Sequence, residues 1–211
     1  MASKLEGRPL LVVKVGGSLL DWPKLTVRLE KFLDSEVARE GGPKPRVVLI
    51  VGGGPVADAI RALDEVHGLS AKRAHRLALG AMDLTAELLA GGLSGGLLVR
   101  SLGELPGAWK AGRRPVLAVR RYMEEVDEAG DSPLPVSWRT TSDSIAARIA
   151  DRLGADRLIL LKSASPVAST RREAAEVDLV DPVFPEASSR LGRVEVVAFR
   201  EPDRPIRTLE A

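Results

Sequence analysis

The chain contains no cysteine, which excludes disulfide bonds, thiolate metal sites and cysteine nucleophiles. Aromatic residues make up only 3% of the 211 residues, so the sequence offers no platform for stacking the bases of a nucleic acid. Charge of one sign does not dominate either, because 31 basic and 29 acidic residues leave a formal net charge of +2. We therefore expect no nucleic-acid partner, and the missing cysteines favour a cytoplasmic protein.

Long hydrophobic runs are absent as well, so we expect neither a secretory signal peptide nor a membrane partner. At the same time 45% of the residues are apolar, which is enough to build one large core. We expect a single domain over residues 1–211. Residues 1–8 should lead into the first strand, and residues 41–45 and 129–135 should form surface loops.

Short apolar runs alternate with helical patterns along the chain. The runs are apolar at consecutive positions, which is typical of strands buried on both faces of a parallel sheet. The segments between them repeat apolar residues three and four positions apart, as helices do. This order predicts an α/β fold in which helices cover both faces of a mainly parallel open sheet, giving a three-layer α/β/α sandwich. The expected strands are 10–15, 47–51, 97–99, 116–119, 158–161 and 194–199, and the expected helices span 25–37, 56–63, 74–89 and 145–153.

Two glycine-rich turns each follow one of these expected strands. The first reads Lys-Val-Gly-Gly-Ser over residues 14–18, and the second reads Gly-Gly-Gly-Pro over residues 52–55. Without Cβ atoms, backbone N–H groups approach an anion closely, and the positive end of a following helix dipole attracts it. The two turns therefore predict a phosphate-binding site, with Lys14 supplying a positive charge.

A third polar segment, Thr-Thr-Ser-Asp-Ser, occupies residues 140–144 just before the expected helix 145–153. The simplest interpretation is local: Thr141 or Ser142 caps the helix, and Asp143 in its first turn faces the helix dipole. The alternative is functional, because ligands collect at the carboxyl ends of strands in an open parallel sheet, where this segment and both glycine turns should meet. The residues themselves leave both interpretations open.

A second lysine follows another expected strand. Lys162 and Ser163 stand directly after residues 158–161, so Lys162 and Lys14 come from different strands to the same edge of the sheet. A carboxylate between them, supplied by Asp143, would keep both ammonium groups charged and aimed. Phosphoryl transfer needs such cations over the oxygens that gain charge, and it needs little covalent help from the protein.

In content, order and spacing, these segments resemble the amino-acid kinase superfamily, which includes acetylglutamate, aspartate, uridylate and isopentenyl phosphate kinases. The resemblance rests mainly on residues 14–18, 52–55, 141–146 and 154–161, and it extends over nearly the whole chain. It implies an open sheet of about eight strands. It also implies ATP as the phosphoryl donor, Mg²⁺ held mainly by phosphates, an acceptor oxygen on a carboxylate or phosphate, and a homo-oligomer.

The resemblance also implies roles for residues. Lys14 matches the first phosphate-binding lysine, and Asp143 resembles the aspartate that orders the lysines. The family's Thr-Asp-Val-Asp-Gly is replaced here by Lys-Ser-Ala-Ser-Pro at 162–166, and the later Gly-Gly-Met segment with its lysine is missing. We hypothesise that Lys162 replaces that second lysine in space. The candidate contacts to the nucleotide phosphates are Gly16, Gly17, Ser18, Ser142 and Ser163, and those to the acceptor are Gly52, Gly53, Gly54, His75, Trp138 and Thr141.

Within the superfamily, residues 74–83 and 135–138 look most like the kinases of methanofuran biosynthesis, whose acceptor is a furan methyl phosphate. A phosphate acceptor is already anionic and needs no general base, which suits a site of lysines and backbone donors. Trp138 would shelter the acceptor ring, and His75 would contact the acceptor. No metal ligand from the protein is predicted.

Two other functions remain open. Gly52, Gly54 and Ala57 satisfy the pattern of a dinucleotide-binding turn, but the acidic residue expected about twenty positions later is missing, because residues 71–79 read as a basic helix. The altered segment 162–166 also fits a protein that binds a nucleotide or oxyanion without turnover. We predict an ATP-dependent phosphotransferase that acts on a small phosphate- or carboxylate-bearing metabolite.

Overall fold

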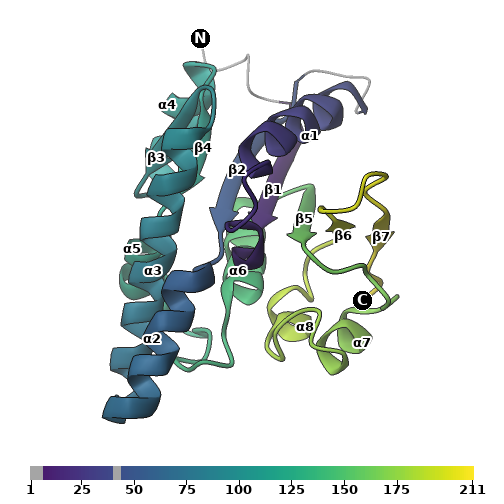
Figure 1. The fold of residues 1–211 in the computed structure, drawn as a ribbon. Helices are drawn as coiled ribbons and strands as arrows, with labels where there is room; N and C mark the ends of the chain where they lie inside the picture. Colours follow the sequence, from purple (N-terminus) through teal and green to yellow (C-terminus); the bar gives the residue numbers. More distant parts are fainter. Residues whose placement is uncertain (1–6, 40–43) are drawn as a thin grey trace.

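The computed structural model describes residues 7–39 and 44–211, so the leader and the loop expected at 1–8 and 41–45 lie largely outside the described residues. Strands and helices alternate along most of the chain (Figure 1). The strands are β1 (Leu10–Val15), β2 (Arg46–Val51), β3 (Gly96–Val99), β4 (Arg114–Leu117), β5 (Arg157–Lys162), β6 (Val194–Ala198) and β7 (Ile206–Thr208). The longer helices are α1 (Leu25–Arg39), α2 (Gly54–His67), α3 (Ala71–Gly92) and α6 (Ser142–Leu153). The short helical segments are η2 (Gly17–Leu19), η3 (Leu102–Glu104), α4 (Leu105–Lys110), α5 (Arg120–Tyr122), η4 (Met123–Asp127), α7 (Arg171–Glu176) and α8 (Phe184–Ala187).

The described strands form one seven-stranded sheet in the order β3-β4-β2-β1-β5-β6-β7. Neighbouring strands are parallel except β6 and β7, which are antiparallel. This confirms the predicted α/β fold with a mainly parallel open sheet, although the family resemblance implied about eight strands. β1 lies at the centre, with β2 on one side and β5 on the other, which is the place where ligands bind in such sheets.

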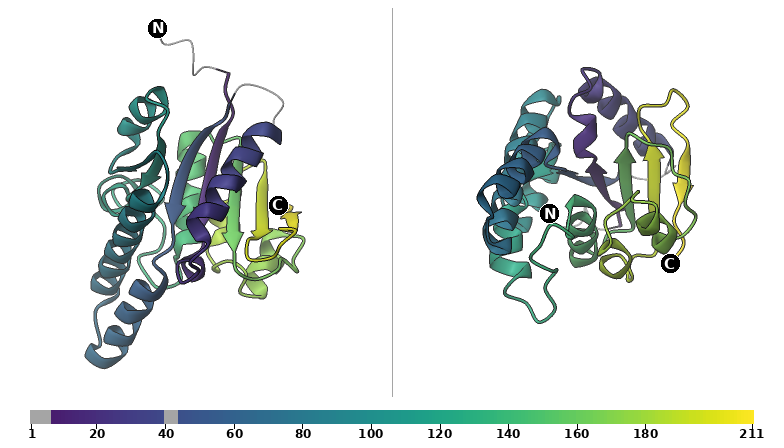
Figure 2. Two further views of the ribbon diagram at one scale, coloured as in Figure 1. Left: turned by 45° about the horizontal axis from the view of Figure 1, so that its top comes forward. Right: turned by 60° about the horizontal axis from the view of Figure 1, so that its bottom comes forward.

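Helices cover both faces of the sheet (Figure 2). α1 packs on one face, where Phe32 and the β1 side chain of Val13 belong to the same apolar cluster. α6 packs on the opposite face, where Ile145 clusters with Val12. Successive side chains of a strand point to opposite faces, so Lys14 lies on the same face as Val12, beneath α6.

β4 begins and ends two residues before the expected strand 116–119. Its ladder with β3 runs up to the pair Val99 and Leu117, where β3 ends. Ala118 and Val119 remain buried, and the N–H group of Ala118 still donates to the carbonyl group of Val99 at 2.9 Å, but the chain turns into α5 at Arg120. The apolar run therefore predicted burial correctly but placed the strand two residues too late.

α2 begins with Pro55 in its first turn and ends at Gly68, whose φ is 58°. None of its residues is buried, and Leu63 and Val66 are 50% and 76% exposed. α2 and the first half of α3 project from the molecule at the lower left of Figure 1. α2 packs against α3, but its Leu63 and Val66 side chains are left largely uncovered by the described part of this chain.

Residues 71–79 belong to α3, so no strand with a terminal acid follows the second glycine turn. This argues against the dinucleotide-binding alternative. Among the helices of the described ranges, none is both long and apolar enough to cross a bilayer.

Candidate active site

Lys14, Asp143 and Lys162 meet beside the carboxyl ends of the central strands. The Nζ atom of Lys14 lies 2.8 Å from Oδ1 of Asp143. The Nζ atom of Lys162 donates a hydrogen bond of 2.6 Å to Oδ2 of the same carboxylate. Asp143 therefore lies between two ammonium groups, in the arrangement that the functional interpretation of the sequence predicted.

Strand register explains why the two lysines converge. β1 and β5 are adjacent and parallel, with Lys14 paired to Leu160. Lys162 lies two residues after Leu160, so both lysines occupy the same face of the sheet. That face is the one covered by α6, and Asp143 stands in the first turn of this helix.

Burial and charge act in opposite directions on the central pair. Lys14 is only 3% exposed, and this burial lowers its pKa from 10.5 to about 8 although the Asp143 carboxylate opposes the shift. Burial by itself would raise the pKa of Asp143, but the ammonium groups of Lys14 and Lys162 outweigh it and lower this pKa to about 2. Asp143 is therefore ionised at neutral pH, while Lys14 titrates not far above it.

Asp181, which no motif in the sequence indicated, holds the start of α6. Its carboxylate accepts hydrogen bonds from the backbone N–H groups of Thr141, Ser144 and Val183 at 3.1, 3.0 and 3.1 Å. It also accepts from the hydroxyl groups of Thr141, at 2.8 Å, and Ser144. Thr141 is the N-cap residue, as predicted, but Asp181 is the acid that satisfies the helix terminus. Asp143 is thereby left to face the lysines.

The two glycine turns pack directly against each other. A Cβ atom on Gly17 would lie 2.4 Å from the backbone nitrogen of Gly54, and one on Gly52 would lie 2.8 Å from the backbone nitrogen of Gly17. Gly54 also has a φ of 49°, which favours glycine. Glycine is therefore needed here for the close approach of two backbones, in addition to the access for an anion that the sequence predicted.

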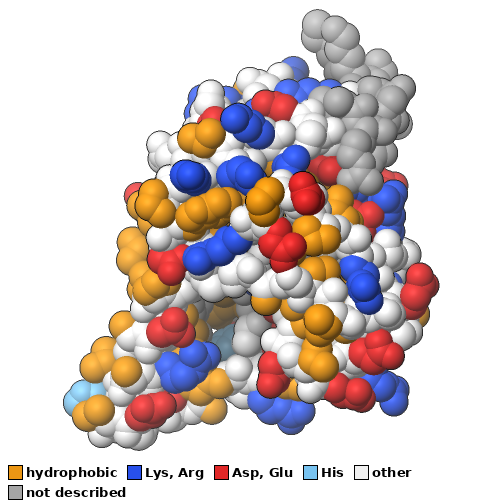
Figure 3. All heavy atoms as spheres, turned by 45° about the vertical axis from the view of Figure 1, so that its right-hand side comes forward, with side chains coloured by type: hydrophobic (Ala, Val, Ile, Leu, Met, Phe, Trp, Pro, Cys, Tyr) orange, Lys and Arg blue, Asp and Glu red, His pale blue; other side chains and the backbone are white. Residues whose placement is uncertain are grey.

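A cavity of about 440 Å³ opens beside these turns, and a space-filling view shows the surface hollowed in this region (Figure 3). This volume suits a small metabolite. Leu79, Met82 and Ile145 give part of its lining an apolar character. The lining also contains every residue that the sequence analysis assigned to the acceptor, namely Gly52, Gly53, Gly54, His75, Trp138 and Thr141.

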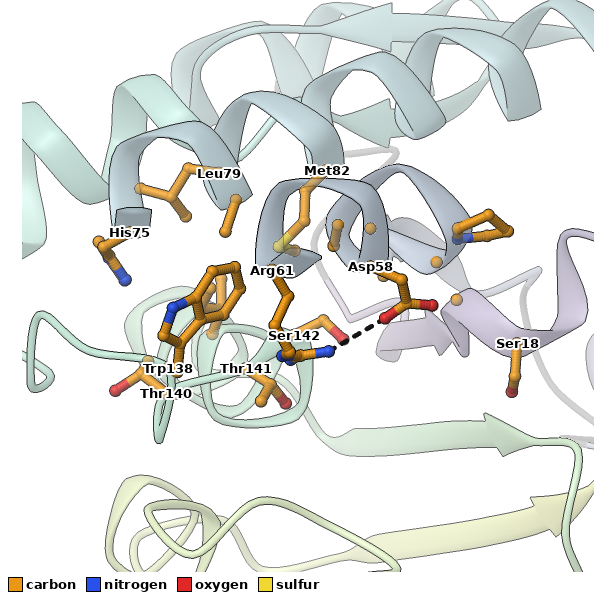
Figure 4. Close-up of a pocket in the computed structure, with 18 of the residues that line it drawn as sticks. Ser18, Asp58, Arg61, His75, Leu79, Met82, Trp138, Thr140, Thr141 and Ser142 are labelled. Carbon is orange, nitrogen blue, oxygen red and sulfur yellow. Dashed lines mark hydrogen bonds and ion pairs between the residues drawn. The ribbon is translucent and has the colours of Figure 1, made fainter. Parts of the chain in front are cut away.

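Trp138 forms one wall of this cavity and is held there by α2 (Figure 4). Its indole N–H donates a hydrogen bond of 2.6 Å to Asp64, and the guanidinium of Arg61 lies 4.7 Å from the centre of its ring system. Arg61 also donates a hydrogen bond of 3.0 Å to Asp58. Arg61 therefore presents a cation to the cavity.

The sequence analysis missed Arg61 and Asp58, although both line the cavity. A signal was present, because these residues lie seven and four positions after Gly54 and so share one face of α2 with it. His75, by contrast, is 4% exposed, and burial lowers its pKa below 6.5. Its imidazole is neutral near pH 7 and hydrogen-bonds the backbone of Ser137, which supports the neighbouring Trp138.

A second cavity, of about 350 Å³, is lined by Lys162 and Ser163. Ser18 lines both cavities, and its hydroxyl oxygen lies 2.9 Å from that of Ser163. Of the other residues assigned to the nucleotide phosphates, Gly17 and Ser142 line the first cavity, whereas the N–H group of Gly16 donates to the backbone of β5. These two cavities thus share one serine, and Lys162 lines the second of them, whereas Lys14 and Asp143 line neither and lie buried behind them.

Comparison with known proteins agrees with this arrangement. A model described as the amino acid kinase family matches residues 9–181, which is most of the chain. A curated relative, (5-(aminomethyl)furan-3-yl)methyl phosphate kinase of Methanocaldococcus jannaschii, is 36% identical over 80 residues. That match covers 37% of this chain and only about a third, 34%, of the relative's length.

Several solved structures share the fold. UMP kinase from Ureaplasma parvum superposes with a TM-score of 0.69 at 13% identity, over 97% of this chain and 100% of that one. Aspartate kinase from Synechocystis gives a TM-score of 0.65 at 14% identity, over 95% of this chain and 40% of that one. Uridylate kinase from Archaeoglobus fulgidus gives 0.57 at 21% identity, over 88% and 89% of the two chains. At these identities the likeness shows the fold alone.

Proposed function

The chain belongs to the amino acid kinase family, and on that premise we propose that it transfers the γ-phosphoryl group of ATP to a small phosphate- or carboxylate-bearing metabolite. The observation that carries the proposal is the contact of one buried carboxylate, Asp143, with the ammonium groups of Lys14 and Lys162. Of this group Lys162 lines the 350 Å³ cavity, and Ser142, the neighbour of Asp143, lines the 440 Å³ cavity. We assign the 440 Å³ cavity to the acceptor and the 350 Å³ cavity to ATP.

In the proposed reaction an anionic oxygen of the acceptor attacks the γ-phosphorus of ATP. The bond from that phosphorus to the oxygen bridging the β-phosphate breaks, and ADP leaves with the bonding electron pair. The acceptor is already ionised, so no proton has to be removed, and a neutral His75 is not needed as a base. Lys14 and Lys162 stabilise the charge that develops on the transferred group and on the leaving oxygen, while Asp143 keeps both lysines aimed.

Magnesium would act on the nucleotide and not as a permanent part of the protein. Within residues 7–39 and 44–211, no group of three potential metal-ligating side chains is found. Such a chain suits Mg²⁺ that is held by phosphate oxygens and water, with the hydroxyl groups of Ser18 and Ser163 beside them. When bound with ATP, the ion would neutralise phosphate charge.

The acceptor cavity supports an anionic acceptor with a flat apolar part. Arg61 offers a cation to an anionic group, and Trp138 with Leu79 and Met82 offers apolar surface. The partial match to a furan methyl phosphate kinase makes a furan methyl phosphate our first candidate. The test is a screen of phosphorylated and carboxylated small molecules for ADP release with Mg-ATP. Release with none of them would contradict the proposal.

A second candidate function is binding of a nucleotide or oxyanion without turnover. The altered segment at 162–166, which lacks the acidic residues usual in the resembled family, favours this alternative. The same screen separates the two functions, because a binding protein would retain ADP affinity and release no ADP from ATP with any acceptor.

Replacing Lys162 by methionine is expected to lower kcat by about 10²-fold or more, because the second cation over the phosphates is lost. The methionine keeps the apolar part of the side chain, so folding should persist. kcat is measured at saturating Mg-ATP and compared with Lys24→Met, which removes an exposed lysine of the same chain. A Lys162→Met variant with the kcat of the unaltered protein would remove Lys162 from the mechanism.

We also expect kcat/KM to fall as the pH rises through about 8, where the free protein loses the charge of Lys14. The direction follows from burial, which favours the neutral amine and lowers this pKa. Bound phosphates favour the ammonium form, so kcat should fall only at higher pH. Initial rates between about pH 6 and about pH 9.5 test this, and a level kcat/KM over that range would contradict it.

A further inference from the structure

The end of α7 adopts a conformation that usually requires glycine. Val177 caps the helix, and the N–H groups of Asp178 and Leu179 donate to the carbonyl groups of Ala175 and Ala174 at 3.3 and 2.8 Å. This is the Schellman arrangement, in which the residue after the cap is left-handed and is most often glycine. Here that residue is Asp178, with a φ of 54°.

Asp178 is unfavourable at this position for two reasons. A left-handed conformation costs an L-residue with a side chain more than it costs glycine, and a carboxylate at a helix C-terminus faces the negative end of the dipole. Within the described part of the chain, its carboxylate has no hydrogen-bond or ion-pair partner that would offset this cost. Aspartate tolerates the left-handed region better than most residues, so the cost is modest, but no contact within the described chain offsets it, and the carboxylate is available to a ligand.

Asp178 lines the 350 Å³ cavity that also contains Lys162. Two valines of the same lining, Val167 and Val177, are 70% and 52% exposed although they are apolar. The cavity thus combines a cation and the hydroxyl of Ser163 with a pair of uncovered apolar side chains and one unpaired carboxylate. Each of these features would contact a different part of a ligand.

The ligand chemistry follows from this combination. Lys162 attracts phosphate, the valines provide apolar surface for a flat ring, and a carboxylate is acceptor-only, so it needs a hydrogen-bond donor. Inorganic polyphosphate would supply only the phosphate groups for Lys162, and the Asp178 carboxylate would repel it. A nucleoside diphosphate or triphosphate supplies all three. We infer that Val167 and Val177 hold the nucleobase and that Asp178 accepts a hydrogen bond from the nucleoside, so that Asp178 determines specificity for the phosphoryl donor.

This inference rests on the proposed function, because it takes the 350 Å³ cavity to be the donor site. Asp178→Gly is the decisive variant, since glycine relieves the left-handed strain and should leave the melting temperature unchanged or higher. We expect its KM for Mg-ATP to rise about tenfold, while the KM for the acceptor stays the same. Val167→Ser should raise the KM for Mg-ATP about fivefold. Glu176→Gln, a nearby exposed acid that is not part of the lining, is the matched control.

Inorganic tripolyphosphate lacks a nucleoside, so it distinguishes loss of the contact between Asp178 and the nucleoside from a general change in how strongly the cavity attracts phosphate. Its inhibition constant against Mg-ATP should not rise in Asp178→Gly. An unchanged KM for Mg-ATP in an active Asp178→Gly protein would overturn the inference and leave the proposed function intact, and so would an equal loss of tripolyphosphate binding.

If the unaltered protein phosphorylates no acceptor, the same comparison is made by calorimetric titration with ADP. Loss of ADP affinity in Asp178→Gly, with tripolyphosphate binding retained, would then support the inference although the proposed turnover had failed. An unaltered protein that binds neither ADP nor tripolyphosphate would overturn both.

Discussion

Replacing Lys14 by methionine is expected to lower kcat by about 10³-fold or more, the largest effect on activity that the structure predicts. Lys14 is 3% exposed, and its Nζ atom lies 2.8 Å from the Asp143 carboxylate. Little water would therefore screen the attraction between its ammonium group and the phosphate oxygens. The replacement removes one cation over the phosphates and one of the two groups that hold Asp143 in place. The measurement is kcat at saturating Mg-ATP and acceptor.

The same variant should remain folded, because Lys162 still pairs with Asp143 and no buried carboxylate is left without a partner. Circular dichroism and a melting curve check this, and Lys24→Met again serves as the control for loss of an exposed lysine. A folded Lys14→Met protein whose kcat lies within about tenfold of the unaltered value would show that Lys14, Asp143 and Lys162 do not form the catalytic centre.

Replacing Asp181 by alanine is expected to cause the largest loss of stability, about 3–5 kcal/mol in the free energy of unfolding. The carboxylate accepts from two backbone N–H groups and two hydroxyl groups at the start of α6 and from the N–H group of Val183, and Asp181 is only 6% exposed. Without it those donors are buried with no acceptor. Urea denaturation followed by circular dichroism measures the change.

Asp178→Asn provides the matched control for stability, because Asp178 lies three residues away and is exposed. We expect its free energy of unfolding to change by no more than about 0.5 kcal/mol. Asp181→Ala should also lower kcat, since a frayed start of α6 no longer aims Asp143 at the lysines. A variant of normal stability would show that water or another acceptor replaces the Asp181 carboxylate without cost.

The candidate site was predictable where it depends on periodicity. Lys14 and Lys162 each end a continuous apolar run, and parallel strands bring their carboxyl ends to one edge of the sheet. The glycine turns were recognised by composition, but their mutual packing was not, because Gly17 and Gly54 come from different turns whose distance no local pattern specifies. The Trp138 wall was predicted as an acceptor contact, whereas its support by Arg61 and Asp64 of α2 was not.

The boundaries of β4 also show that local sequence does not predict contacts between distant segments. Burial of residues 116–119 followed from their apolar character, yet the strand spans Arg114–Leu117, where it pairs with β3. Strand ends depend on the neighbouring strand, and the neighbour of β4 cannot be identified from the composition of β4.

The sequence by itself determined the layers, the alternation of strands and helices along the chain, and the placement of the two lysines at one edge of the sheet, because these follow from short periodic patterns and from chain direction. Only the tertiary structure decided what Asp143 contacts. Its position in the first turn of α6 is compatible with capping that helix or with pairing the lysines. Asp181 resolves the choice, since it reaches Ser144 across 37 residues and occupies the helix terminus itself. Contacts between distant segments depend on how the whole chain closes, and no local spacing encodes them.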